Sequence, residues 1–216
     1  MVIEIWDVAL KKFGFINKMV WHDDVELPKS DLVVLPGGFS YGDYLRCGSM
    51  ASKSKIMRSV IDFANSGGLV MGICNGFQIL VETGLLPGAL LRNKYLEFIC
   101  KNVFIKIENK NNPYFKNLDK NVLEFHIAHN EGNYFCTNEQ LKEIEDNDQV
   151  AIYYSDKDGK TEEKFNPNGS LKNIAGIFNK KKNVLGMMPH PERMIDKSLS
   201  GEDGSLFFKN LINNIK

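Results

Sequence analysis

A strand–turn–helix pattern that occurs twice constrains the fold of this chain more than any other feature of its sequence. Residues 31–38 read DLVVLPGG, and residues 69–73 read LVMGI; both are short aliphatic runs of the length of a buried strand. Apolar residues at helical spacing follow each run, in residues 54–68 and again in residues 75–84, and a glycine closes each segment. Strands that alternate with helices in this way are typical of a parallel sheet covered by helices.

The second half of the chain predicts strands of a different kind. Residues 98–109 and 151–156 have the composition of strands, and two apolar runs within residues 174–192 flank a lysine-rich turn, as in a hairpin. Residues 204–216 carry apolar side chains along one helical face, which predicts a closing helix. No linker, repeat or low-complexity segment interrupts the pattern. We therefore expect a single α/β domain over residues 1–216, with a mainly parallel sheet and an antiparallel extension.

Composition and charge exclude several classes of partner. The chain has 27 basic and 27 acidic residues, so its formal net charge is zero, and nothing in it favours nucleic acid or an anionic membrane. The N-terminus has no basic region of the kind found in signal peptides, and no apolar run approaches membrane-spanning length. The four cysteines lack C-x-x-C spacing, which argues against a disulfide scaffold and a zinc site. We expect a cytoplasmic protein without a metal.

Cys74 is the first candidate for chemistry. It lies between Gly72 and Gly76, where the strand at 69–73 meets the next helix. A cysteine in G-x-C-x-G at such a turn resembles the nucleophile elbow, which holds its nucleophile in a strained conformation and needs small neighbours. The helix N-terminus would also stabilise a thiolate. A buried cysteine beside turn glycines is the alternative, and the flanking glycines favour the nucleophile.

A cysteine nucleophile needs a base, and two histidines stand in H-x-E motifs. His190 follows the apolar run VLGMM, so it should lie at the carboxyl end of a strand, where open α/β sheets bind their ligands. Two prolines bracket His190, and Glu192 could hold its imidazole in one tautomer. His129, followed by Asn130 and Glu131, is the rival; its segment is either a loop near the site or an ordinary turn.

Acyl transfer also needs donors for the oxyanion. The backbone N–H of Asn75, directly after the nucleophile, is one candidate, and the N–H of Gly38 is the other. Loops that follow neighbouring parallel strands meet at one edge of a sheet, so both donors can converge there. Alone, the Pro-Gly-Gly sequence that contains Gly38 would more simply be a turn that ends a strand.

Several motifs together resemble class I glutamine amidotransferases, the family with a catalytic triad. The resemblance is most specific to the glutaminase subunits of phosphoribosylformylglycinamidine synthase, and it runs from about Trp6 to the final helix. It rests on LPGGFSYGDYLRCG at 35–48, GICNGFQIL at 72–80, GLLPGAL at 84–90, NPNGS at 166–170 and VLGMMPHPER at 184–193.

This resemblance implies a flavodoxin-like, three-layer fold and assigns roles to residues. Cys74 would be the nucleophile, His190 the base and Glu192 the group that orients the base. The backbone of Gly38 and Asn75 would form the oxyanion hole. The glutamine site would include Gly37, Gly38 and Gln78.

The resemblance also implies the reaction and its partners. Glutamine would be hydrolysed to glutamate and ammonia, and a large synthetase subunit would use the ammonia and ATP to convert formylglycinamide ribonucleotide to formylglycinamidine ribonucleotide in purine biosynthesis. A small third subunit would complete the complex. Residues 48–54 come nearest to a P-loop but lack the second glycine before lysine, so ATP and Mg²⁺ are expected on the partner and no cofactor in this chain. A flavodoxin-like cysteine peptidase and a catalytically weak regulatory subunit remain alternatives.

Two departures from the family are visible. Family members open with a strand, whereas residues 1–15 have apolar residues at helical spacing, so we expect the first strand of the sheet to be missing. Either the natural chain begins upstream, which we expect because an empty internal strand position leaves backbone groups unpaired, or residues 1–5 form a poor substitute. Asn130 stands where the family usually has glycine, and asparagine tolerates the positive φ that such a turn would require.

Overall fold

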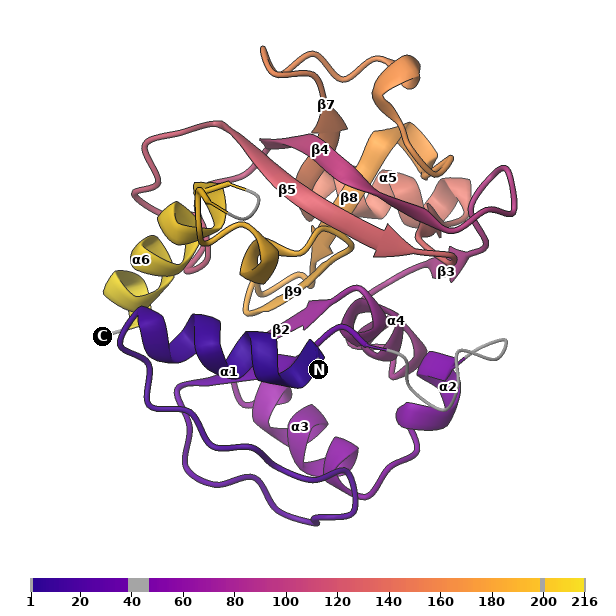
Figure 1. Ribbon diagram of the computed structural model, residues 1–216. Helices are drawn as coiled ribbons and strands as arrows, with labels where there is room; N and C mark the ends of the chain where they lie inside the picture. The colour runs from indigo at the N-terminus through magenta and orange to yellow at the C-terminus, as the bar shows by residue number, and fades with distance from the viewer. Residues whose placement is uncertain (1, 39–46, 199–200, 216) are drawn as a thin grey trace.

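The fold is built on a seven-stranded sheet, which crosses the middle of Figure 1. The computed structural model describes residues 2–38, 47–198 and 201–215. Within them the strand order is β1-β2-β9-β8-β7-β4-β5, and a two-stranded sheet pairs β3 with β6. The strands are β1 (Leu32–Leu35), β2 (Leu69–Ile73), β3 (Ala89–Leu91), β4 (Ile99–Ile107), β5 (Val122–His129), β6 (Asn133–Phe135), β7 (Val150–Ser155), β8 (Ile174–Phe178) and β9 (Val184–Met187).

Parallel pairing is confined to one end of the large sheet. Strand β2 pairs in parallel with β1 on one side and with β9 on the other. From β9 onward the pairs β9-β8, β8-β7, β7-β4 and β4-β5 are antiparallel. The predicted α/β fold with an antiparallel extension is confirmed, and the hairpin expected around the lysine-rich turn is β8–β9. The carboxyl ends of β1, β2 and β9 share one edge, which is where the predicted site should lie.

Helices pack around this sheet. They are α1 (Val2–Lys12), α2 (Cys47–Ala51), α3 (Ile56–Asn65), α4 (Asn75–Glu82), α5 (Asn138–Asp146) and α6 (Asp203–Ile215), with short 3₁₀ turns η2 (Glu163–Phe165), η3 (Leu171–Asn173) and η4 (Pro191–Arg193). The helices expected after β1 and β2 and at the end of the chain are α3, α4 and α6. None of the helices in the described ranges is both long enough and apolar enough to cross a membrane.

The opening segment is a helix, as its periodicity predicts. Trp6 of helix α1 is buried, and its ring meets the Phe208 ring of α6 edge-on at 5.6 Å. Phe13 stacks on the Phe208 ring at 5.4 Å. Figure 1 shows α1, in indigo, lying close to α6, in yellow. The alternative of a substitute strand at residues 1–5 is wrong, because residues 2–5 are helical. Among the described strands β1 pairs with β2 alone, and the expected upstream strand stays a prediction.

Glycines allow α4 to sit directly on the parallel strands. A Cβ atom on Gly76 would lie 1.9 Å from the carbonyl oxygen of Leu35 in β1. A Cβ on Gly72 would lie 2.6 Å from the carbonyl oxygen of Gly76, and one on Gly186 in β9 would lie 2.2 Å from the Phe77 ring. The small residues on both sides of Cys74 are therefore required by backbone contacts between β1, β2 and α4.

We expect the substitution Gly76→Ala to destabilise the fold by at least about 3 kcal/mol, because the added methyl group meets backbone that cannot move aside like a side chain. Thermal unfolding followed by circular dichroism measures this loss. Gly84→Ala is the matched control, since Gly84 ends the same helix with φ +75° and no atom within 4 Å of the added Cβ. Only backbone strain of about 1 kcal/mol is expected there. Equal losses in the two variants would contradict the close contact.

Candidate active site

Cys74 occupies a strained turn between β2 and α4. Its φ and ψ are +53° and −105°, a conformation that non-glycine residues adopt rarely. The turn is held by the Cys74 N–H, which donates to the Met187 carbonyl at 2.8 Å, and by the Gln78 N–H, which donates to the Cys74 carbonyl at 3.1 Å. The predicted strand-to-helix elbow is therefore present, with the cysteine at the carboxyl ends of β2 and β9.

His190 lies three residues after the end of β9, beside Cys74. Its backbone N–H donates to the His126 carbonyl of β5 at 2.8 Å, which fixes the segment against the antiparallel part of the sheet. A Cβ atom on Gly37 would lie 2.7 Å from Cε1 of His190 and 3.3 Å from Cβ of Cys74. Gly37, in the loop after β1, therefore packs directly against both side chains. A larger residue at this position would clash with them.

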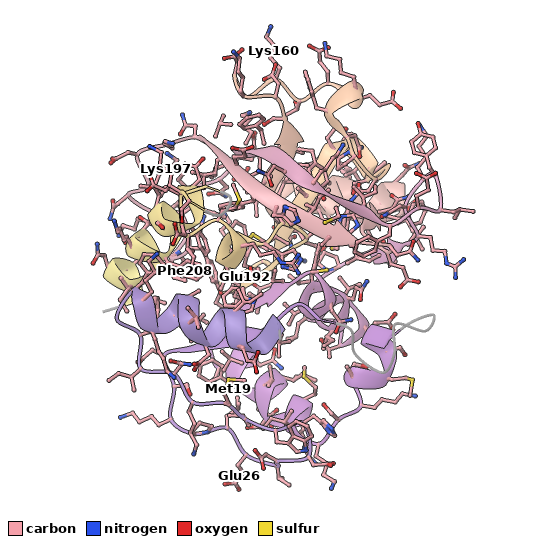
Figure 2. All side chains as sticks on the ribbon, in the orientation of Figure 1. Met19, Glu26, Lys160, Glu192, Lys197 and Phe208 are labelled. Carbon is pink, nitrogen blue, oxygen red and sulfur yellow. The ribbon has the colours of Figure 1, made fainter. Side chains whose placement is uncertain are left out.

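Glu192 completes a row of three side chains. Its Oε1 lies 2.6 Å from Nδ1 of His190, and both residues are about 1% exposed. Figure 2 shows Glu192 near the centre of the view, far from peripheral side chains such as Lys160. Because Nδ1 is committed to the carboxylate, Nε2 is the nitrogen left for chemistry. Nε2 is buried and finds no hydrogen-bond partner among the described residues.

The surroundings of His190 favour its charged form. Burial alone would lower the pKa of the ring, but the Glu192 carboxylate and the Cys74 side chain outweigh it and raise the pKa to about 9. A ring with this pKa takes a proton readily from a nearby thiol. The arrangement of sulfur, imidazole and carboxylate therefore has the order of a nucleophile, its base and the group that orients the base.

A cavity of about 200 Å³ opens onto the sulfur. Its lining includes four of the predicted site residues around Cys74, namely Gly38, Asn75, Gln78 and His190, whereas Glu192 lies behind the imidazole. The Asn75 amide donates to Oε1 of Gln78 at 2.8 Å, and the Gln78 amide donates to the Glu131 carbonyl at 2.9 Å. Residues 39–46 of the LPGGFSYGDYLRCG motif lie outside the described residues.

His129 plays a different part from His190. It is 3% exposed, and its Nδ1 lies 3.0 Å from Oδ1 of Asn93, whose amide donates to the His129 and Glu97 carbonyls. Burial and the neighbouring His190 lower the pKa of His129 to about 3, so the ring stays neutral. Asn130 does not adopt a positive φ, so the turn does not use the conformation that asparagine tolerates. The turn is held instead by the Asn93 N–H, which donates to the Asn130 carbonyl at 2.9 Å.

Sequence patterns missed several residues around the cavity. Phe98 and Cys100 reach it from β4 and the segment before it, and Ala128 and Arg193 also line it. The Ala128 carbonyl oxygen lies 3.8 Å from the Cys74 sulfur. Strand β5 alternates buried apolar residues with less buried ones, but which residues of β5 face Cys100 is decided only by its pairing with β4. Within the described ranges no three His, Cys, Asp or Glu side chains gather as metal ligands.

We expect His190 and His129 to differ sharply under the same substitution. His190→Gln removes the base beside the sulfur and should lower kcat for the glutamine hydrolysis that the sequence predicts by about 10³, within the range of general-base catalysis. His129→Gln changes a neutral wall residue and should cost no more than about tenfold, with the pH profile unchanged. Steady-state glutamate release from both variants, over a range of pH, tests this difference. A larger loss in His129→Gln would reverse the assignment.

Comparison with known proteins agrees with this geometry. The model of the CobB/CobQ-like glutamine amidotransferase domain matches residues 5–202. The chain belongs to the glutamine amidotransferase family. A phosphoribosylformylglycinamidine synthase subunit PurQ from Pelagibacter ubique (strain HTCC1062) is 80% identical over 97% of this chain and 92% of its own length. The PurQ subunit of Synechocystis sp. is 50% identical over 94% and 92% of the two chains. Within the amidotransferases, the chain groups with the PurQ subunits.

Solved structures agree on the amidotransferase fold. A chain in the structure of PurLQS from Thermotoga maritima aligns with a TM-score of 0.85 and 40% identity, over 99% of this chain and 92% of that one. A putative GMP synthase subunit from Thermoplasma acidophilum aligns with a TM-score of 0.64 at 18% identity, over 100% and 88%, which shows the shared fold alone. The amidotransferase fold therefore persists where most of the sequence has changed.

Proposed function

We infer that this chain is the glutaminase subunit of phosphoribosylformylglycinamidine synthase, the enzyme that forms formylglycinamidine ribonucleotide in purine biosynthesis. It hydrolyses glutamine to glutamate and ammonia. The observation that carries the reaction is the row Cys74–His190–Glu192, whose first two members line one cavity. The 80% identity to a PurQ subunit supports the enzyme to which the ammonia is supplied.

The proposed reaction uses each of these groups in turn. His190 takes the thiol proton at Nε2, and the Cys74 sulfur attacks the side-chain carbonyl carbon of glutamine. The backbone N–H groups of Asn75 and Gly38 stabilise the oxyanion of the tetrahedral intermediate. The His190 imidazolium then protonates the departing ammonia. A water molecule, deprotonated by the same ring, hydrolyses the thioester and releases glutamate.

Burial of the triad supports this mechanism. Glu192 has no access to water and cannot share its charge with solvent, so its interaction with the imidazolium is strong at the moment when His190 becomes charged. The 2.6 Å contact also keeps Nδ1 protonated, which leaves the Nε2 lone pair toward the sulfur. The strained backbone of Cys74 at the start of α4 holds the sulfur in place beside this ring. Gln78, whose amide donates to the Glu131 carbonyl, would form the glutamine site together with the backbone of Gly37 and Gly38.

We propose that the ammonia passes to a large synthetase subunit and that a small third subunit completes the complex. The Thermotoga maritima structure that aligns with this chain is of a complex named PurLQS, which supports such an assembly. The triad chemistry needs a nucleophile, a base and oxyanion donors, so this chain would need no cofactor, and ATP and Mg²⁺ would bind the synthetase subunit. A cytoplasmic location is part of this proposal, because the substrates of the reaction are intracellular metabolites.

Reconstitution tests the proposed function. The purified chain is mixed with the synthetase and small subunits from Pelagibacter ubique, the source of the relative that is 80% identical. Product formation from formylglycinamide ribonucleotide, ATP and glutamine is then measured. We expect glutamine-dependent product and an equal release of glutamate. Cleavage of peptides without glutamine hydrolysis would favour a peptidase. A complex that assembles but uses only added ammonium would favour a regulatory subunit.

A further inference from the structure

A second cysteine and histidine lie side by side outside the catalytic row. Cys100 is exposed on β4, and its sulfur lies 3.3 Å from Nε2 of His126 on β5. On the other side of the ring, Nδ1 of His126 lies 2.9 Å from Oδ1 of Asn102. In the β4–β5 ladder Asn102 is directly opposite His126, and Cys100 is opposite Ala128, so the three side chains share one face of the sheet.

The hydrogen bonds fix the tautomer of this histidine. The Asn102 amide nitrogen donates to a Glu124 carboxylate oxygen at 3.3 Å, so the amide oxygen is the atom that faces His126. An amide oxygen only accepts, and Nδ1 must therefore carry the proton. Nε2 is then left with a lone pair, and the Cys100 thiol donates to it. This order of thiol, imidazole and amide is the arrangement that activates a cysteine nucleophile.

The histidine is available as a neutral base. Its pKa lies below the usual value for histidine because the ring is partly buried, and because the positive charges of Arg193 and His190 disfavour another one nearby. At neutral pH the Nε2 lone pair is therefore free to accept the thiol proton. Cys136, in contrast, is 4% exposed, and burial raises the pKa of its thiol.

The position of Cys100 gives this thiol a consequence for catalysis. Cys100 and the half-exposed Phe98 lie on the rim of the cavity that has the Cys74 sulfur at its floor. The same strand that carries His126 also supplies the Ala128 carbonyl beside Cys74. A group attached to Cys100 would therefore stand in the path to a cavity of only about 200 Å³.

We propose that Cys100, His126 and Asn102 form a thiol-modification site at the mouth of the cavity, where a low-molecular-weight disulfide forms a mixed disulfide with Cys100. His126 accepts the thiol proton, and the thiolate attacks one sulfur of the disulfide. One sulfur–sulfur bond forms as the other breaks, and the departing thiolate takes the proton from the imidazolium. The adduct blocks glutamine entry, a consequence that rests on the proposed glutaminase function.

Labelling tests the site itself, without any assay of activity. The Cys74→Ala chain is exposed to glutathione disulfide, and the adduct is followed by intact mass and located by peptide mapping. We expect Cys100 to be modified fastest among the cysteines, and His126→Gln to slow that rate at least tenfold. His22→Gln, at an exposed histidine remote from Cys100 in the chain, is the matched control and should leave the rate unchanged. The proposal would be overturned if Cys100 were modified as fast in His126→Gln, or in the chain unfolded in urea, as in the folded Cys74→Ala chain.

Activity in the reconstituted complex tests the block. Each complex is compared with itself before and after glutathione disulfide. The complex with native cysteines should lose most of its glutamine-dependent synthesis, keep its ammonia-dependent synthesis and recover with dithiothreitol, whereas Cys100→Ser should lose far less. Equal losses in both would place the sensitive thiol elsewhere and overturn the block. Absence of glutamine-dependent synthesis before treatment would instead contradict the proposed function, and the labelling result would stand independently.

Discussion

The Cys74→Ala complex should lose its glutamine-dependent synthesis by a factor on the order of 10⁴ to 10⁶, because the acyl intermediate forms on the Cys74 sulfur. Cys74 is the thiol at the floor of the cavity, next to His190. Synthesis from added ammonium salts should persist in the same complex, since activation of the acceptor is assigned to the synthetase subunit. Product formation with each nitrogen source, measured on the same preparation, gives both results.

Controls separate loss of the nucleophile from loss of structure. Cys136→Ser alters a buried thiol that is outside the cavity lining, and it should cost stability at most. Size-exclusion chromatography confirms that the Cys74→Ala complex assembles. Full glutamine-dependent activity in that complex would remove Cys74 as the nucleophile. Loss of ammonia-dependent synthesis would show that this chain does more than supply ammonia.

The second large effect is expected from Glu192→Gln, which keeps the shape of the side chain and removes its charge. Glu192 touches Nδ1 of His190 at 2.6 Å, with both groups buried. The amide stabilises the imidazolium far less, so kcat should fall by about 10² to 10⁴. Glutamate release at saturating glutamine measures the loss. Glu139→Gln, on the solvent side of α5, is the matched control and should retain full activity.

The same variant should change the titration of His190. Burial lowers the pKa of this ring, and Glu192 is the largest of the groups that raise it to about 9. Without the carboxylate, only the Cys74 side chain opposes the effect of burial, so the pKa should fall well below 9. Nuclear magnetic resonance of the imidazole protons follows the titration directly. An unchanged pKa in Glu192→Gln would mean that the carboxylate does not set the charge of the base.

The raised pKa also predicts how stability depends on pH. Because the folded chain holds the His190 proton more tightly than the unfolded chain, the stabilisation is fully present below pH 6.5. It is lost as the pH rises from 6.5 through about 9. In Glu192→Gln this part of the pH dependence should disappear.

Local sequence determined the elements that hold the site. Gly72 is required by contacts with Gly76 and Leu80 of the following helix, so G-x-C-x-G after an aliphatic run predicts the elbow, although Gly76 also makes room for Leu35 of β1. His190 and Glu192 are two residues apart, and their contact is equally local. The opening helix follows in the same way from the spacing of Trp6 and its apolar neighbours.

Only the tertiary structure decided which of these elements meet. The insertion of β9 between β2 and β8 brings His190 beside Cys74, and no periodicity encodes a pairing between segments so far apart in the chain. Two H-x-E motifs look alike in sequence, yet His129 lies against Asn93 with its ring neutral, while His190 lies against Glu192 with its pKa raised. Burial and neighbouring charge, which set those pKa values, exist only in the folded chain.

The cluster at the cavity mouth shows the same division. No sequence motif links Cys100, Asn102 and His126. The antiparallel register of β4 and β5 sets Asn102 opposite His126 and leaves Cys100 diagonal to it. A shift of one residue would turn these side chains to opposite faces. The sequence by itself determined the elbow, the H-P-E segment and the α/β class, because those depend on neighbours in the chain. Strand order and register decided which thiol meets which imidazole, because those depend on the packing of the whole sheet.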